Sequence, residues 1–152
     1  VRAIDTRWKE LQREAHPDKF AAQGPAAQRI AMQWSVRINE AYQRLKDPIK
    51  RASYLCGLNG HPIDAEKNTA MPPDFLMQQM EWREELDEAR EAAAFDKLRA
   101  EVEAGRARAL SSLEWLIDKN GDYAGAARQV RALMFIERFA EDIEAKFEAW
   151  GQ

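Results

Sequence analysis

The residues best suited to chemistry are His16 and Asp18, which stand on either side of Pro17. An imidazole and a carboxylate at this spacing could form an acid–base pair, or could present polar groups to another protein. A chain of this length contains His-Pro-Asp by accident about 1% of the time, so an incidental turn stays an open interpretation. Acid–base catalysis needs a substrate pocket and usually a further orienting residue, and no other histidine or cysteine looks like a partner. We therefore expect that the chain is not an enzyme and has no catalytic residues.

The segment before this tripeptide must position it. Ile4, Trp8, Leu11 and Ala15 recur at helical spacing and form one apolar stripe. A residue that precedes proline is pushed out of the α region, so this helix should stop near Ala15. The face opposite the stripe is basic and carries Arg2, Lys9 and Arg13.

A second helix should run antiparallel to the first. Residues 20–25 are expected to form a loop, and Pro25 suits a first helical turn. The apolar residues that follow share one face: Ile30, Trp34, Ile38, Ala41, Tyr42 and Leu45. Asp47-Pro48 should end this helix and open a short one that stops at Gly57 or Gly60. Two facing apolar stripes predict a helical hairpin with His16-Pro17-Asp18 on its loop.

The remaining chain predicts a second domain. Residues 57–74 are rich in glycine and proline and show no periodicity, which is typical of a domain boundary. From Asp74, a candidate N-cap, to Trp150 we expect three long amphipathic helices with breaks near 92–95 and at 120–122. The expected domains are therefore residues 1–58, a linker at 59–74, and an antiparallel three-helix bundle at 75–152. The predicted fold class is all-α.

The first helix of this bundle has two apolar faces. At about 100° per residue, one narrow stripe should face the core: Phe75, Trp82, Leu86, Ala89 and Ala93. On the other side lie Leu76, Met77 and Met80, grouped with Glu81, Glu84 and Glu88. Apolar residues away from the core and rimmed by acids are typical of an interface, although burial of this face against the small domain is an alternative.

The last helix of the bundle shows the same kind of exception. Its core stripe is expected to consist of Leu133, Ile136, Ala140 and Ile143. Phe135 lies well off that stripe. Phe135 is therefore a second case, on a different helix, of an apolar residue that lies off the core stripe and that we expect to be exposed.

Composition limits the remaining function classes. Charged residues make up 32% of the 152 and apolar ones 45%. No apolar run approaches the length of a membrane span, and Val1-Arg2-Ala3 begins no signal-peptide pattern. Two histidines and the single Cys56 cannot build an ordinary zinc site, so we expect no metal and no cofactor. A lone cysteine forms no disulfide within the chain, so we expect a reducing compartment. Residues 1–60 hold 11 Lys/Arg against 6 Asp/Glu, a charge of +5, and residues 61–152 hold 12 against 20, a charge of −8. This asymmetry suggests two partner surfaces of opposite charge preference, although solvated faces alone could produce it. A charge of +5 is too small to indicate nucleic-acid binding.

Taken together, the motifs resemble those of a J-domain cochaperone, and in particular of the HscB type that serves iron–sulfur cluster assembly. They are His16-Pro17-Asp18-Lys19-Phe20, 38–42 (Ile-Asn-Glu-Ala-Tyr), Asp47-Pro48, 51–55 (Arg-Ala-Ser-Tyr-Leu), Phe75-Leu76-Met77 and 82–88 (Trp-Arg-Glu-Glu-Leu-Asp-Glu). The resemblance covers the whole chain and implies an L-shaped, two-domain molecule. J-domains begin with a short helix ahead of the basic one, and that opening helix is missing from this sequence.

The resemblance also implies two partners. A DnaK/HscA-class chaperone ATPase would bind Arg7, Lys9, Arg13, His16, Pro17 and Asp18, and its ATP hydrolysis would be stimulated. The iron–sulfur scaffold protein, of the IscU type, would bind Leu76, Met77, Met80, Glu81, Glu84, Glu88 and Phe135. We expect a monomer in the bacterial cytoplasm, or in the mitochondrial matrix if the source is eukaryotic. Two rival functions are a helical interaction module that does not stimulate a chaperone and a metal-dependent enzyme, for which the ligands are lacking.

Overall fold

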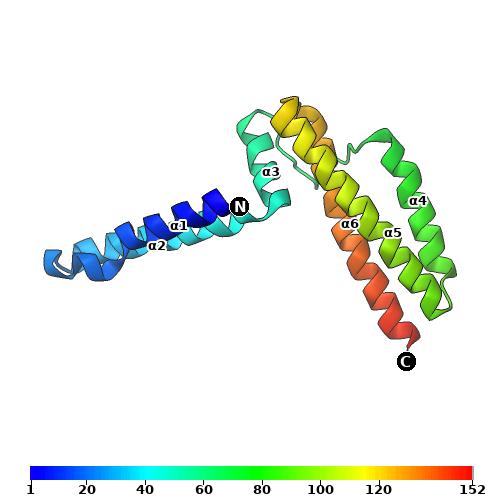
Figure 1. Ribbon diagram of the computed structural model, residues 1–152, viewed down its shortest axis with the longest axis horizontal. Helices are drawn as coiled ribbons and strands as arrows, with labels where there is room; N and C mark the ends of the chain where they lie inside the picture. Colours follow the sequence, from blue (N-terminus) through cyan, green and yellow to red (C-terminus); the bar gives the residue numbers. More distant parts are fainter. Residues whose placement is uncertain (152) are drawn as a thin grey trace. The chain divides into compact units, whose positions relative to one another are not determined.

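The computed structural model describes residues 1–151 and is helical, with no strand in that range, which confirms the all-α prediction (Figure 1). The chain divides into two compact units, Val1–Arg51 and Ala52–Gln152. Within residues 1–151 no helix is long and apolar enough to cross a membrane. The division falls inside one helix, and residues 59–74 lie in the second unit, so the domain boundaries drawn from sequence stay a prediction.

The first unit is a hairpin of α1 (Arg2–Ala15) and α2 (Pro25–Lys46), joined by a 3₁₀ helix, η1 (Pro17–Gln23). The stop at Ala15 is confirmed, because His16 is extended (φ −60°, ψ 129°), as a residue before proline should be. The expectation of a loop over residues 20–25 is wrong for most of that range. Pro17 occupies the first turn of η1, and the chain reverses only at Gly24, whose φ of 97° favours glycine.

Polar side chains join α1 to α2. Trp8 Nε1 and Gln12 Nε2 both donate to Asn39 Oδ1 at 2.9 Å, and Tyr42 Oη donates to Asp5 Oδ1 at 2.7 Å. Trp8 also stacks on Tyr42, with ring centroids 4.5 Å apart. The bond to Asp5 is the main cause that raises the pKa of the Tyr42 hydroxyl. These bonds set the register of the hairpin.

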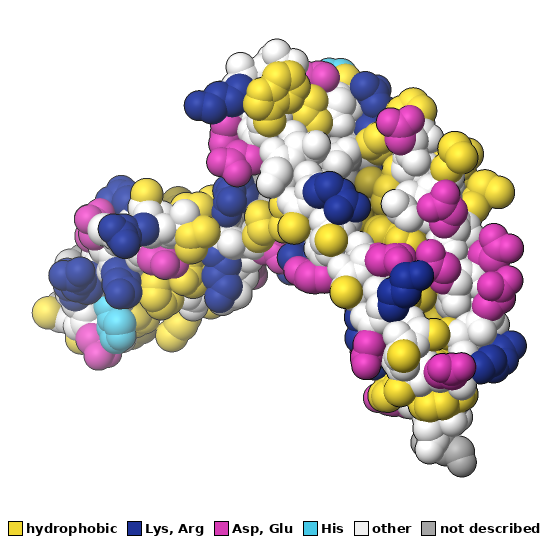
Figure 2. Space-filling view, turned by 45° about the vertical axis from the view of Figure 1, so that its right-hand side comes forward, with side chains coloured by type: hydrophobic (Ala, Val, Ile, Leu, Met, Phe, Trp, Pro, Cys, Tyr) yellow, Lys and Arg dark blue, Asp and Glu magenta, His cyan; other side chains and the backbone are white. Residues whose placement is uncertain are grey.

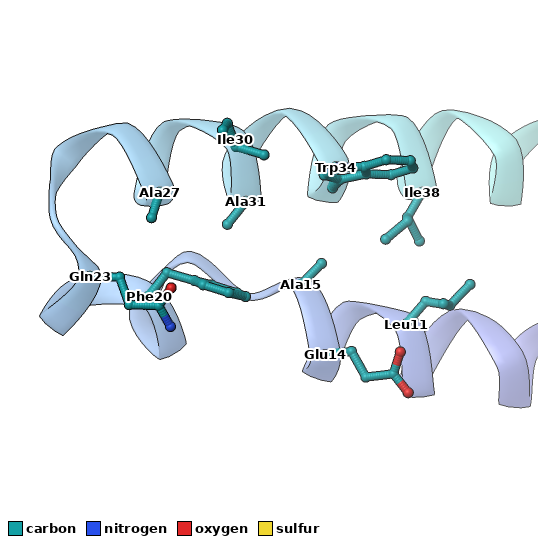
Figure 3. A pocket seen from close by; sticks show the side chains of 10 residues that line it. All are labelled: Leu11, Glu14, Ala15, Phe20, Gln23, Ala27, Ile30, Ala31, Trp34 and Ile38. Atoms are coloured by element: carbon teal, nitrogen blue, oxygen red, sulfur yellow. The ribbon is translucent and has the colours of Figure 1, made fainter.

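The apolar stripes of the hairpin form an open groove rather than a closed core. Of the residues in α1 and α2, only Ala31 is buried. Figure 3 shows Ala31 and Ile38 of α2 directed toward the side of Leu11 and Phe20, with the Trp34 ring lying along α2. These residues line a groove of about 460 Å³. Ile30 and Trp34 remain 56% and 58% exposed. The expected mutual burial of the stripes is incomplete because two helices cover only part of each other, and full burial needs a third element.

Asp47 begins α3 (Pro48–Leu58) by accepting bonds at Oδ1 from the backbone N–H groups of Ile49 and Lys50, at 2.9 and 3.0 Å. In the second unit, the segment after α3 is bound to the bundle. Arg131, 5% exposed, donates to the carbonyl oxygens of Ile63 (2.9 Å), Ala70 (3.0 Å) and Pro62 (3.4 Å). This buried guanidinium has main-chain partners, so its burial is compensated by hydrogen bonds.

The bundle consists of α4 (Pro73–Glu88), α5 (Ala92–Glu114), a π-helical turn η2 (Trp115–Lys119) and α6 (Tyr123–Trp150) (Figure 1). Its largest buried side chains are Trp82, Phe95, Leu98, Leu133, Ile136, Phe139 and Ile143. The break at 120–122 is confirmed, and Asp122 caps α6 by accepting from the Gly125 N–H at 2.9 Å. Lys146 of α6 caps the other end of α4, because its ammonium donates to the carbonyls of Leu86 and Asp87. The Lys146 bonds therefore join the C-terminal end of α4 to α6.

Four expectations for the bundle are wrong. Asp74 lies inside the first turn of α4 and is not its N-cap. The first break falls at residues 89–91 and not at 92–95, so Ala93 lies in the first turn of α5 and is exposed rather than part of the α4 core stripe. Ala140 is also exposed, because the neighbouring Phe139 takes the core position with its larger ring.

Candidate functional site

The loop at His16-Pro17-Asp18 has a fixed local geometry. The His16 Nδ1 atom accepts a hydrogen bond from the Asp18 backbone N–H at 3.2 Å, and the Lys19 N–H donates to the His16 carbonyl at 3.0 Å. A neutral imidazole that accepts at Nδ1 carries its proton on Nε2. The two side chains are 57% and 90% exposed. The loop therefore presents an exposed imidazole and an exposed carboxylate in a preset arrangement.

This arrangement does not suit acid–base catalysis. The Nδ1 atom is already used by the backbone, and the nearest Asp18 oxygen lies 3.6 Å away. The groove of the hairpin is lined by Leu11, Phe20, Trp34 and their neighbours, and neither His16 nor Asp18 contributes to it. Two exposed side chains outside the groove are suited to contact with another protein.

The basic side chains of α1 are exposed. Arg7, Lys9 and Arg13 all face solvent, and Arg7 is paired with Glu10 at 3.1 Å. Figure 2 shows Lys and Arg side chains gathered over the hairpin near a histidine. Exposed pairs contribute little to folding, so these charges remain available to a partner.

The outward face of α4 is as expected from sequence. Leu76, Met77 and Met80 are 61%, 68% and 65% exposed, and we call these three residues the apolar strip of α4. The acids grouped with the strip are exposed as well: Glu81, Glu84 and Glu88. Figure 2 shows hydrophobic and acidic side chains together along the outer edge of the bundle. The strip is an unpartnered apolar surface with an acidic rim.

One further acid of α4 belongs elsewhere. Glu85 is half-buried and lies near Glu101 of α5. Burial is the main cause that raises the pKa of the Glu85 carboxyl, and the carboxyl of Glu101 raises it further. Glu85 is therefore part of the contact between α4 and α5.

Phe135 differs from the expectation. It is half-buried rather than exposed, because Phe75 of α4 packs edge-on against it with centroids 5.7 Å apart, and Phe139 stacks on it at 5.8 Å. The exposure of Phe135 was predicted from the angular positions of residues on one helix, and such positions cannot show that another helix lies over it. The rings of Phe75, Phe135 and Phe139 form what we call the aromatic shelf.

Arg83 was missed in the sequence analysis. Its guanidinium lies 5.4 Å from the centroid of Phe135 and 5.7 Å from that of Phe139. The signal in the sequence was available, since Arg83 is the single basic residue among six acidic ones in α4.

No group of three or more His, Cys, Asp or Glu within residues 1–151 is placed to hold a metal ion.

Comparisons with known proteins agree in sequence and structure. Residues 71–144 match the family model described as the HSCB C-terminal oligomerisation domain. The chain is 48% identical over 146 residues to a co-chaperone protein HscB homolog of Bordetella petrii, covering 95% of this chain and 86% of the relative. A homolog of the same name from Burkholderia multivorans is 51% identical over 149 residues, covering 96% and 85%.

Two solved structures are similar over most of their length. The structure of chaperone HscB from Vibrio cholerae has a TM-score of 0.73 at 34% identity and covers 97% of this chain and 88% of its own. The crystal structure of human co-chaperone protein HscB has a TM-score of 0.78 at 27% identity, with coverage of 93% and 72%.

Proposed function

Because the chain belongs to the HscB co-chaperone family, we propose that it stimulates the ATPase of a DnaK/HscA-class chaperone and delivers an IscU-type scaffold protein to it. The family is not enzymatic, and membership gives the chain a co-chaperone role in iron–sulfur cluster assembly.

The observation that carries the proposal is the preset, exposed loop at His16-Pro17-Asp18. A protein that stimulates another protein's ATPase must bind one state of that enzyme better than the other. A loop whose shape is already fixed by the bond between His16 Nδ1 and the Asp18 N–H loses little entropy on binding. The exposed Arg7, Lys9 and Arg13 would steer an acidic partner surface toward it.

The apolar strip of α4 supports the second half of the proposal. Leu76, Met77 and Met80 expose more than half of their surface, and flexible methionines suit contact with an adaptable client. Glu81, Glu84 and Glu88 would form the polar rim of that contact. The scaffold protein is the client that we assign to this strip.

The remaining partners follow the same proposal. We expect no nucleic-acid or membrane partner and a monomeric chain. The relatives from Bordetella and Burkholderia are bacterial, which supports a location in the bacterial cytoplasm. Sedimentation would test the monomer against the self-association that the name of the matched domain suggests.

An ATPase assay tests the chaperone half directly. Steady-state hydrolysis by a DnaK/HscA-class chaperone is measured with the wild-type chain, with His16→Gln and with Asp18→Asn. The wild type should raise the rate, and both variants should abolish the increase with unchanged helicity and melting temperature, since an exposed loop contributes little to the fold. A chain that binds the scaffold but never changes the ATPase rate would instead be an interaction module.

A further inference from the structure

We propose that Arg83 is the anion-recognising residue of the scaffold-binding surface, and that it binds a carboxylate side chain of the scaffold protein. The inference rests on the proposed scaffold contact at the apolar strip of α4. It also gives Phe135 a further role, because its ring would hold Arg83 in place.

The first observation is the unusual pairing of Arg83. The other charged residues of α4 are acidic, and Asp87 lies one turn away at the i+4 position, where an ion pair would be ordinary. Within residues 1–151, however, no carboxylate oxygen forms an ion pair with a guanidinium nitrogen of Arg83 at a distance of 4.0 Å or less. The guanidinium lies instead over Phe135 and Phe139 of α6.

The aromatic shelf explains how this position is held. A guanidinium over ring faces is attracted by their quadrupoles and is partly ordered by them. Phe135 is itself held by Phe75 at 5.7 Å and Phe139 at 5.8 Å, so the surface beneath Arg83 is rigid. A ring face takes up no strong hydrogen bond, and the N–H donors of Arg83 therefore remain available to an anion.

The surroundings favour a carboxylate from a protein partner. Arg83 lies three residues after Met80 and directly before Glu84, so it shares α4 with the apolar strip and with its acidic rim. An acidic residue of the scaffold would be repelled by Glu81, Glu84 and Glu88 at most places along this helix. It would be accepted at Arg83, which would fix the register of the two proteins.

The test is calorimetric titration of an IscU-type scaffold protein into the full chain at low and high salt. Arg83→Gln should weaken binding about tenfold at low salt and flatten its salt dependence, because one charge-assisted contact is lost. Arg83→Lys should recover only part of the affinity, since an ammonium lacks the planar fork. Arg128→Gln is the control, because it removes the charge of an exposed arginine on a different helix, α6, and it should leave scaffold binding unchanged.

The role of Phe135 is tested by a double-mutant cycle. Phe135→Leu removes the ring face but keeps apolar volume, and it should weaken binding in the wild-type background and have little effect beside Arg83→Gln. Equal weakening in both backgrounds would mean that the ring contacts the scaffold directly, which overturns the positioning role. Melting curves of each variant confirm that the bundle is folded.

The cycle also separates this inference from the function that it assumes. If the wild type binds the scaffold and Arg83→Gln binds equally well with the same salt dependence, the inference alone is overturned. If the wild type does not bind the scaffold at all, the scaffold contact and the inference are overturned together.

Discussion

The change Gly105→Ala tests how tightly Trp82 fixes α4 on the bundle. A Cβ at position 105 would lie 2.8 Å from Trp82 Cη2 and 3.0 Å from Cζ2. Trp82 cannot move aside easily, because it is 1% exposed and lies between Phe75 and Phe139, at centroid distances of 6.0 and 5.9 Å. Overpacking of this kind costs about 1–3 kcal/mol.

A second effect opposes that cost. Replacing glycine by alanine inside a helix stabilises it by about 1 kcal/mol. At Gly105 the net change should therefore be a loss of up to about 2 kcal/mol of unfolding free energy. Gly57 is a matched control in the same unit, because it is helical, exposed and has nothing within 4 Å of a built Cβ. Gly57→Ala should stabilise the unit by up to about 1 kcal/mol.

Urea unfolding followed by circular dichroism measures both variants against the wild type. The midpoints should move in opposite directions, and scaffold binding should weaken for Gly105→Ala alone, because a displaced Trp82 moves the apolar strip of α4. If Gly105→Ala stabilises the chain as much as Gly57→Ala does, Trp82 is not held as the structure indicates. The reasoning about the position of α4 would then be wrong.

Three further outcomes are expected. Reversing Arg7, Lys9 and Arg13 to Glu should slow association with the chaperone and reduce its salt dependence, as stopped-flow measurements at two ionic strengths would show. Changing the apolar strip of α4 to Ala should cost at least about 2 kcal/mol of scaffold binding by calorimetry with little loss of stability, whereas Trp82→Ala or Leu86→Ala should destabilise the bundle by about 2–5 kcal/mol. Because the pKa of Glu85 is raised above its ordinary 4.5, the folded chain binds this proton more tightly than the unfolded chain does, so unfolding free energy should fall as the pH rises through that raised pKa. Glu85→Gln should reduce this fall in a series of urea curves, and an unchanged pH profile would count against the burial of Glu85 beside Glu101.

What could be predicted from sequence depended on how local the cause was. The stop of α1 at Ala15 follows from Pro17 two residues later, and the exposure of Met77 follows from the period of one helix. The position of Phe135 could not be found in this way, because Phe75 covers it from 60 positions earlier in the chain. The binding of the segment after α3 was missed for the same reason. Arg131 binds carbonyls at Pro62 and Ala70, and no pattern around residue 131 points to them.

The site shows the same division. The residues of the apolar strip and its acidic rim share a helix, so one period places them together. The relation between Arg83 and Phe135 joins two helices and depends on how α4 and α6 pack. Sequence reasoning therefore predicted which residues face outward on α4, and it could not predict which ring lies under which cation.

The three carbonyls bound by Arg131 have a consequence for sequence variation in related chains. Every residue type has a main-chain carbonyl, so Arg131 holds the path of the segment from Pro62 to Ala70 without recognising its side chains. The exposed positions of this segment should therefore tolerate substitution freely while their course over the bundle is preserved. Position 131 should not tolerate even lysine, because a single ammonium cannot replace the separate donors that a guanidinium directs to three oxygens.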